Sequence, residues 1–303
     1  MLYILLKLLP TFSYIALGYV AKRWLSLSQS LIARLLFYVF VPALVFKGAL
    51  LSDTGSFILL SALSFSVSLI VGFLVKGLAP YFKDVLDLGV LRCLYAYFNL
   101  GWFGIPMMYL LFGDEGALIM TGMYVGNMLF GNTIGFLWLT SDQPSGQSAL
   151  QKLLRIPALY AMLVGFVLHF SPFFSELSTY LPLRNVLDFC TIVVSILGMG
   201  LVGMSVAHTS FKTIAWKKLL VLLGSRIALS IMVSGTLGLF AWQLGGLSLL
   251  AMKVFVLMSL MPIASNILVI AIHTQQENEF VGLTLLFSTL LSCVLMMGCF
   301  AVL

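Results

Sequence analysis

Apolar runs long enough to cross a lipid bilayer follow one another along almost the whole chain. A transmembrane helix needs about 20 apolar residues, and it bonds its backbone polar groups within the segment. The shorter alternating segments typical of membrane β-barrels are absent from the sequence. Of the 303 residues, 61% are hydrophobic and 9% are charged, which leaves little chain for a soluble domain. The sequence therefore predicts an all-α integral membrane protein in contact with the lipid bilayer.

Windowed hydropathy predicts ten transmembrane helices. They lie near residues 2–21, 31–51, 56–76, 89–112, 117–139, 156–174, 185–206, 217–242, 250–272 and 280–302. The first run lacks a basic leader segment and a small-residue cleavage site, so we expect it to be retained as the first helix.

Lysine and arginine are distributed unequally between the two sides of these spans. With the N-terminus outside the cytoplasm, eleven basic residues lie on the cytoplasmic side and four on the other. The cytoplasmic group is Lys22, Arg23, Arg34, Lys76, Lys83, Arg92, Lys152, Arg155, Lys212, Lys217 and Lys218, and the other group is Lys7, Lys47, Arg184 and Lys253. Since cytoplasmic loops carry the excess of positive charge, both termini are expected on the non-cytoplasmic side. The net charge of +6 then reflects topology, and no nucleic-acid partner is expected.

The longest polar link, at residues 140–155, divides the predicted spans into two groups of five. An odd number of crossings turns the second group upside down, so residues 1–139 and 156–303 are predicted to be inverted repeats. The fourth span of each group is interrupted, by GWFGIP in span 4 and by LMPIASN in span 9. Paired interruptions of this kind are typical of transporters whose discontinuous helices cross near the bilayer midplane. Glycine and proline also make harmless kinks in membrane helices, and this alternative stays open.

Each interruption would expose half-helix ends, whose N–H groups attract anions and whose carbonyls attract cations. The substrate-binding residues predicted at the two breaks are Asn99, Gly101, Gly104, Ile105 and Pro106 in span 4, and Pro262, Ile263, Ala264 and Asn266 in span 9. Asparagine offers both a donor and an acceptor without a buried charge. Capping of the freed backbone is the alternative role for Asn99 and Asn266.

Arg226 and Asn127 complete the predicted substrate-binding set. At about 1.5 Å per residue, Arg226 lies about 13 Å inside span 8, where an unpaired cation is costly. Three roles are open for it: an ion pair with Asp188, bonds to backbone carbonyls or snorkelling, and a counter-charge or gate for a carboxylate substrate. Asn127 shares a helix face with Gly131 and Gly135, a spacing that usually serves close packing. Contact with the substrate path is the second interpretation of Asn127.

Four segments are similar to motifs of a known family. They are ARLLFYVFVPALVFKGAL (33–50), FNLGWFGIPMMYLLFGDEGA (98–117), SILGMGLVGMSVA (195–207) and MPIASNILVIA (261–271). Their order and spacing resemble those of the auxin efflux carrier family, which contains plant auxin exporters and many bacterial relatives. The resemblance implies an inverted-repeat fold like that of bile-acid and sodium/proton carriers, with a scaffold and a crossover domain. It also implies transport of small organic anions, with substrate contacts at Asn99, Gly104, Pro106, Pro262 and Asn266.

Two departures from that family refine the expectation. The central link is short where the plant exporters have a long cytoplasmic loop, which favours a bacterial-type member in the cytoplasmic (inner) membrane. Span 3 contains serines but no carboxylate, so a proton-coupling acid that relatives place there has no counterpart.

The sequence thus favours a secondary transporter, an exporter or exchanger of small organic anions such as carboxylates. The alternative is a membrane receptor or sensor that binds a small organic ligand without transporting it. No catalytic motif, metal-ligand spacing or nucleotide loop is visible, so neither an enzyme nor a cofactor is expected. Coupling to Na⁺, through backbone carbonyls, asparagine, Ser259 and Ser265, or to H⁺ is left open. Apolar helix faces are also compatible with a homodimer.

Overall fold

The computed structural model describes residues 2–51, 57–140, 151, 154, 157–207, 215–273 and 279–302. Within these ranges the regular elements are all helices, and the one pairing of extended backbone is an isolated β-bridge. Most of the predicted link at 140–155 lies outside the described residues, as do Lys152, Arg155 and Lys212.

The first half of the chain contains long helices with short irregular turns inside them. In chain order these are α1 (Leu2–Leu25), α2 (Gln29–Leu35), η1 (Leu36–Phe40), α3 (Val41–Leu51), α4 (Phe57–Leu74), η2 (Val75–Leu78), α5 (Ala79–Phe82), α6 (Leu88–Ala96), η3 (Leu100–Gly104), α7 (Ile105–Phe130), η4 (Gly131–Gly135) and α8 (Phe136–Leu139). The helix α7 changes direction at Gly113, whose φ of 66° is a left-handed conformation that glycine adopts without a steric penalty. Predicted spans 4 and 5 meet at this bend.

The second half has the same character. Its helices are α10 (Pro157–His169), α11 (Phe174–Thr179), α12 (Leu181–Val206), α13 (Trp216–Gln243), α14 (Leu249–Leu257), η5 (Met258–Leu260), α15 (Asn266–His273) and α16 (Glu279–Val302). The Ser248 hydroxyl accepts a hydrogen bond from the Ala251 N–H and caps the start of α14.

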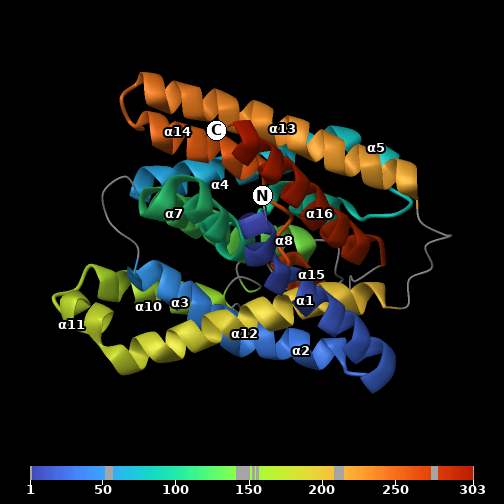
Figure 1. Ribbon diagram of the computed structural model, residues 1–303, viewed down its shortest axis with the longest axis horizontal. Coiled ribbons are helices and arrows are strands. Elements are labelled where there is room, and N and C mark those ends of the chain that lie inside the picture. The colour runs from blue at the N-terminus through green and yellow to red at the C-terminus, as the bar shows by residue number, and fades with distance from the viewer. Residues whose placement is uncertain are drawn as a thin grey trace.

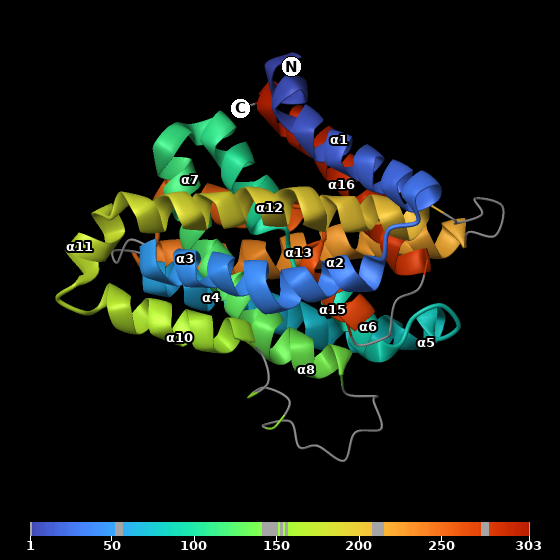
Figure 2. The same ribbon diagram turned by 90° about the horizontal axis from the view of Figure 1, so that it is seen from below.

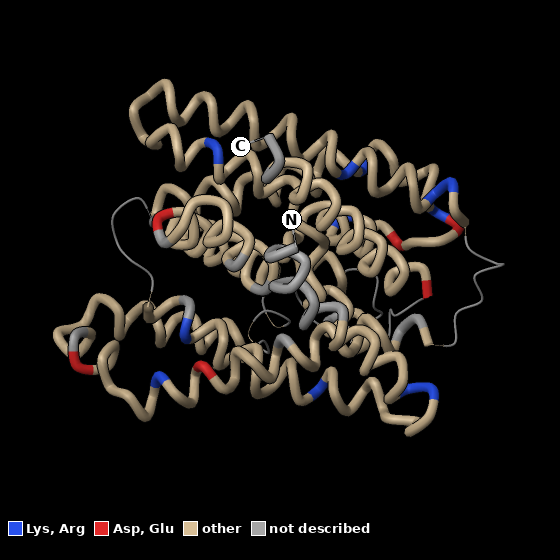
Figure 3. The backbone as a smooth tube through the Cα atoms, viewed as in Figure 1, with Lys and Arg blue, Asp and Glu red and all other residues tan. Residues whose placement is uncertain are grey.

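Five helical segments of the described chain are long and apolar enough to cross a membrane. They are Gln29–Leu51, Ile58–Phe82, Leu181–Met204, Trp216–Gln243 and Glu279–Cys299. Pro157–His169 and Leu249–Leu260 are apolar but shorter. Predicted spans 4 and 9 are divided by irregular backbone, so their separate helices fall below the length of a full span. Figure 3 shows long stretches of backbone without a charged residue. The protein is therefore a membrane-embedded helical bundle.

The helices form two groups, which lie one above the other in Figure 1. The lower group contains α1, α2, α3, α10, α11 and α12, and the upper group contains α4 to α7 and α13, α14 and α16. Within the lower group α1 packs on α12 and α3 packs on α10, and within the upper group α4 packs on α7 and α13 on α14. Figure 2 shows α12 running beside α2 and α3 along the length of the molecule.

Glycines allow the closest of these contacts. A Cβ atom added to Gly203 on α12 would lie 1.8 Å from the Ile15 carbonyl oxygen on α1. A Cβ atom on Gly18 would lie 1.9 Å from the Gly200 carbonyl oxygen. Small residues let membrane helices approach to this distance. Gly200 and Gly203, in the LGMGLVG segment of α12, are therefore positions where α12 approaches α1 closely.

Candidate binding site between the two helix groups

The two interrupted segments of the chain meet in the structure. The first runs from the end of α6 at Ala96 to the start of η3 at Leu100, and the second from the end of η5 to the start of α15. Phe98 and Ile263 form an antiparallel bridge between them. The Asn99 N–H donates to the Pro262 carbonyl at 2.8 Å, and the Ala264 N–H donates to the Tyr97 carbonyl at 3.1 Å. Four helix ends therefore converge on one short stretch of paired backbone. We call this meeting of the two interrupted segments the crossing.

Side chains of neighbouring helices bond the remaining backbone groups of the bridge. Asn127 on α7 donates its amide to the Phe98 carbonyl at 2.7 Å, and its carbonyl accepts from the Phe98 N–H at 3.3 Å. The Ser68 hydroxyl on α4 donates to the same Asn127 oxygen at 3.2 Å. Ser288 on α16 accepts a hydrogen bond from the Ile263 N–H at 2.8 Å. Asn127 is buried, and its amide is bonded to the Phe98 backbone through both its nitrogen and its oxygen.

Arg226 binds both interrupted segments through their carbonyl groups. Its Nε donates to the Leu94 carbonyl at 3.1 Å, near the end of α6, and its Nη1 donates to the Met261 carbonyl at 3.0 Å, just after η5. Its guanidinium carbon lies 4.6 Å from the centre of the Phe98 ring. A cation is favourable at helix C-termini, where the unpaired carbonyls carry partial negative charge. Among the three roles open for Arg226, the structure shows the bond to backbone carbonyls.

The predicted alternative of an Arg226–Asp188 ion pair is wrong. Asp188 on α12 pairs with Lys47 on α3, with 2.5 Å between Nζ and Oδ1. Arg226 is 2% exposed, and within the described residues its Nη2 has no hydrogen-bond partner. The partners of Arg226 are the carbonyls of the two breaks, which lie beside α13.

The first break lies upstream of the residues that the sequence emphasised. Gly104 and Pro106 are inside helical backbone, because η3 continues directly into α7. Pro106 is the second residue of α7, at the junction where the π-helical turn η3 passes into α-helix. The Gly104 N–H donates to the Asn99 carbonyl at 3.1 Å. The irregular backbone is therefore at 97–99, and Pro106 lies inside the helix that follows the break; its side chain is outside the described part of the chain.

Asn266 begins α15 and lies close to the other segment. Its amide nitrogen donates to the Tyr97 hydroxyl at 3.4 Å. Asn99 is 3% exposed and is held in the bridge by its backbone. Both asparagines therefore lie at the crossing, and Asn266 contributes a side-chain contact between the two segments.

A cavity of about 230 Å³ lies beside the crossing, between the two helix groups. Its lining residues are Leu44, Lys47 and Leu51 of α3, Gly101 of η3, Ile105, Thr121 and Tyr124 of α7, and Thr191 of α12. Two of the predicted site residues, Gly101 and Ile105, are in this lining. The other predicted residues that the structure describes lie outside the lining and belong to the crossing. They are Asn99, Gly104, Pro262, Ile263, Ala264, Asn266, Arg226 and Asn127.

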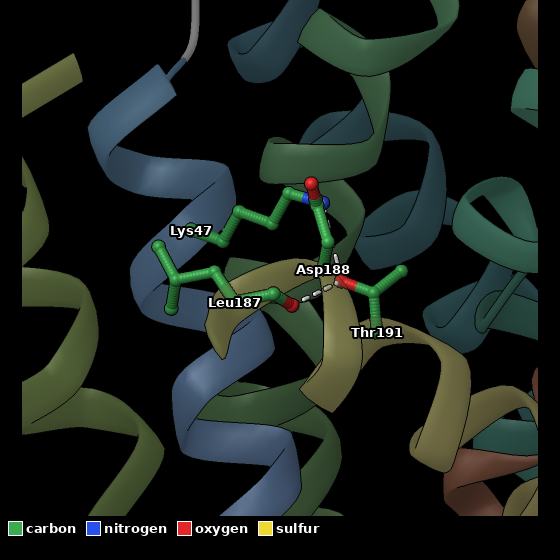
Figure 4. Close-up of polar contacts among 4 residues, drawn as sticks. All are labelled: Lys47, Leu187, Asp188 and Thr191. Carbon is green, nitrogen blue, oxygen red and sulfur yellow. Dashed lines mark hydrogen bonds and ion pairs between the residues drawn. The ribbon is translucent and has the colours of Figure 1, made fainter. Parts of the chain in front are cut away.

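Lys47 carries the charge of the cavity lining. Besides its ion pair with Asp188, its ammonium donates to the Thr191 hydroxyl at 3.2 Å, and Thr191 in turn donates to the Leu187 carbonyl at 2.8 Å. Figure 4 shows Lys47 reaching from α3 toward the Asp188 and Thr191 side chains. Across the cavity, the Tyr124 hydroxyl is buried and has no hydrogen-bond partner among the described residues. The Tyr124 ring packs on Gly101, where an added Cβ atom would lie 2.9 Å from the ring.

Sequence reasoning missed Lys47, Tyr124, Thr121 and Thr191. A signal was present for Lys47, because a lysine inside an apolar run has to bury its stem and find a partner for its ammonium group. In the charge pattern of the sequence, Lys47 counts only as one of four basic residues on the non-cytoplasmic side. Tyr124 and the threonines gave no comparable signal, since hydroxyl residues are ordinary in membrane helices.

No family model and no curated protein matches the sequence. The site itself therefore carries the functional argument.

Proposed function

We propose that this protein is a secondary carrier that moves small organic anions across the membrane by alternating access. The observation that carries the proposal is the position of the cavity, which takes Lys47 and Thr191 from one helix group and Gly101, Ile105 and Tyr124 from the other. A site shared between two helix groups opens to either side of the membrane when one group moves against the other. The paired interruptions next to the cavity are the feature that such carriers use.

Pairwise relationships in the bundle support two inverted repeats. The two interrupted segments pair through an antiparallel bridge, which has the local two-fold arrangement that an inverted repeat requires, as any antiparallel bridge does. The bridge N–H of each segment is also bonded by a side chain from the last predicted span of its own half, Asn127 for Phe98 and Ser288 for Ile263. Likewise α1 packs on α12 while α10 packs on α3, which are first-with-second spans of opposite halves. These relationships favour ten spans in two groups of five.

The charges near the cavity favour an anion. Lys47 supplies an ammonium group, and the carbonyls of Leu94 and Met261, which would otherwise attract a cation, are bonded to Arg226. A carboxylate is recognised by charge-assisted hydrogen bonds, which are about twice as strong as neutral ones. The resemblance of the crossing segments to the auxin efflux carrier family agrees with this substrate class, and the distribution of lysine and arginine supports both termini outside the cytoplasm of a bacterial cell.

Flux through proteoliposomes tests the proposal. Purified protein is reconstituted, and uptake of labelled short carboxylates is compared with that of empty liposomes under an imposed membrane potential. We expect saturable uptake that Lys47→Met abolishes while the variant still inserts and elutes as a folded protein. Binding of carboxylates without uptake would instead identify a receptor, and the carrier proposal would be wrong.

A further inference from the structure

The cation of the cavity already holds a carboxylate. Lys47 Nζ lies 2.5 Å from Asp188 Oδ1 and 3.2 Å from the Thr191 hydroxyl. The Asp188 side chain is 56% exposed, whereas that of Lys47 is 24% exposed. Lys47 and Thr191 line the cavity, and Asp188 is outside the lining. Figure 4 shows the Asp188 carboxylate meeting the tip of Lys47 on the side of Thr191. An exposed carboxylate therefore reaches inward to the ammonium group of a cavity residue.

We propose that Asp188 occupies the anion position of this cavity, and that the ligand is a small molecule with one carboxylate and an apolar body, which displaces Asp188 from Lys47. This inference rests on the proposed function, because it takes the cavity as the ligand site. It goes beyond that function by assigning the ligand's charge number and by giving Asp188 the role of an intramolecular competitor.

The polar groups of the lining suffice for one carboxylate. Among the described residues that line the cavity, Lys47 is the one charged side chain. The Thr191 and Thr121 hydroxyls already donate to the carbonyls of Leu187 and Ala117, both at 2.8 Å. The Tyr124 hydroxyl has no hydrogen-bond partner within the described chain, but it is buried with almost no accessible surface, so it is not a donor to the cavity. The Lys47 ammonium therefore matches one carboxylate group.

A second carboxylate would find no counter-charge. The remaining lining residues are Leu44, Leu51, Ile105 and Gly101, which are apolar. Burial of an ionised carboxylate without a partner is strongly unfavourable. The same residues suit a hydrocarbon body. At about 230 Å³, the cavity is also smaller than the about 300–1,000 Å³ of pockets for drug-sized ligands, so the body is short.

Release of Asp188 from Lys47 costs little free energy. The Asp188 side chain is 56% exposed and lies about two turns from the start of α12 at Leu181, so the proposal takes it to reach the water at that end of the helix once it leaves Lys47. Exposed ion pairs contribute little net free energy because water competes for both charges. The ligand's carboxylate would keep Lys47 neutralised throughout, so no unpaired cation is left in the cavity.

Binding to the purified full-length protein tests the inference, with hexanoate, adipate and hexanamide as probes in isothermal titration. The three probes have the same chain length and carry one, two and no carboxylates. We expect hexanoate to bind more tightly than the other two. Asp188→Asn should tighten hexanoate about two- to fivefold, because it removes the competitor. Lys47→Met should weaken hexanoate at least about tenfold.

Two further variants keep the test decisive. Asp84→Asn removes the carboxylate of another lysine–aspartate pair, Lys218–Asp84, which is outside the cavity lining, and it should leave hexanoate binding unchanged. Lys47→Met/Asp188→Asn removes both charges of the pair, so it tests the loss of binding even where Lys47→Met alone fails to fold.

Each outcome decides one statement. Unchanged or weaker binding of hexanoate to Asp188→Asn would overturn the competitor role. Adipate binding as tightly as hexanoate would overturn the assignment of one carboxylate, and hexanamide binding equally well would overturn the anion site. If hexanoate binds as expected but proteoliposomes show no flux of any carboxylate, the carrier proposal fails while the present inference stands.

Discussion

The carbonyl oxygen of Met261 accepts a 3.0 Å hydrogen bond from the Arg226 guanidinium, which also donates to the Leu94 carbonyl at 3.1 Å. One side chain therefore joins the ends of two helices that belong to different halves of the chain. Since all three groups are buried, neither carbonyl has water as a substitute partner. This arrangement makes Arg226 a positioning residue for the whole crossing.

Arg226→Met should lower the stability of the folded protein. The variant removes two hydrogen bonds to a charged group, each worth about 1.5–3 kcal/mol, and it leaves two carbonyls buried without partners. A clear fall in the melting temperature in detergent is the expected measurement. Arg34→Met, at an exposed position of α2, is the control and should melt like the wild type. Equal melting of both variants would show that the carbonyl contacts do not hold the crossing.

Asn127→Ala should also destabilise the protein, because it leaves the Phe98 N–H without a partner and removes one of the two hydrogen bonds to the Phe98 carbonyl, which also accepts from the Leu100 N–H. Each buried group without a partner costs about 1–3 kcal/mol. The matched control is Asn132→Ala, since the Asn132 amide donates to Met128 on its own helix. We expect a larger loss of thermal stability at Asn127 than at Asn132. The reverse order would contradict the role assigned to Asn127.

Gly203→Ala should separate α1 from α12. The added Cβ atom would lie 1.8 Å from the Ile15 carbonyl oxygen, a distance that forces the backbones apart. Overpacking of this kind costs about 1–3 kcal/mol. Gly224→Ala on α13 is the control, because no atom lies within 4 Å of its added Cβ. Glycine inside a helix is about 0.5–1 kcal/mol less favourable than alanine, so the control should be neutral or slightly stabilising in thermal melting.

The Lys218–Asp84 pair should give a pH-dependent contribution to stability. A hydrogen bond from Lys218 lowers the pKa of the Asp84 carboxyl below its usual value. A carboxyl whose pKa is lower in the folded state stabilises the fold above its unfolded pKa, and this stabilisation is lost as the pH falls through the folded pKa. Asp84→Asn should therefore melt below the wild type at pH 7, with a difference that disappears in acid. A difference that persists or grows in acid would contradict this linkage.

Transport by the proposed carrier should not require sodium. The carbonyls of Leu94 and Met261 at the crossing are bonded to Arg226, so they are not available as ligands for a coupling cation. Carboxylate uptake into proteoliposomes should be equal in sodium and in choline buffers of the same ionic strength. Uptake that appears only in sodium would show that a cation site lies elsewhere in the bundle.

The sequence predicted where the helices are interrupted better than what the interruptions do. Glycine and proline act locally, so GWFGIP and LMPIASN indicated irregular backbone near the right places. Proline is also tolerated inside membrane helices, and for this reason Pro106 misplaced the first break. The extended residues Tyr97 to Asn99 have no such marker, because their conformation comes from pairing with the second segment.

The partners of charged residues were beyond sequence reasoning. Asp188 was considered for Arg226, whereas it pairs with Lys47, from which it is separated by 141 positions. Which of two cations an aspartate meets depends on the rotation and the neighbours of each helix. The apolar spans give little information on either, because lipid-facing and protein-facing surfaces have similar composition. Most of the cavity lining was missed for the same reason, since it combines residues from α3, η3, α7 and α12.

The pairing of Phe98 with Ile263 also constrains how the protein is made. A ribosome completes the first interrupted segment long before it reaches the second. The Asn99 N–H and the Tyr97 carbonyl therefore enter the membrane before their partners, the Pro262 carbonyl and the Ala264 N–H, exist. Until synthesis nears its end, the newly made chain has to keep this segment near water or within the insertion machinery. Biogenesis of the two halves is thus coupled, and a separately expressed amino-terminal half would lack the backbone that completes it.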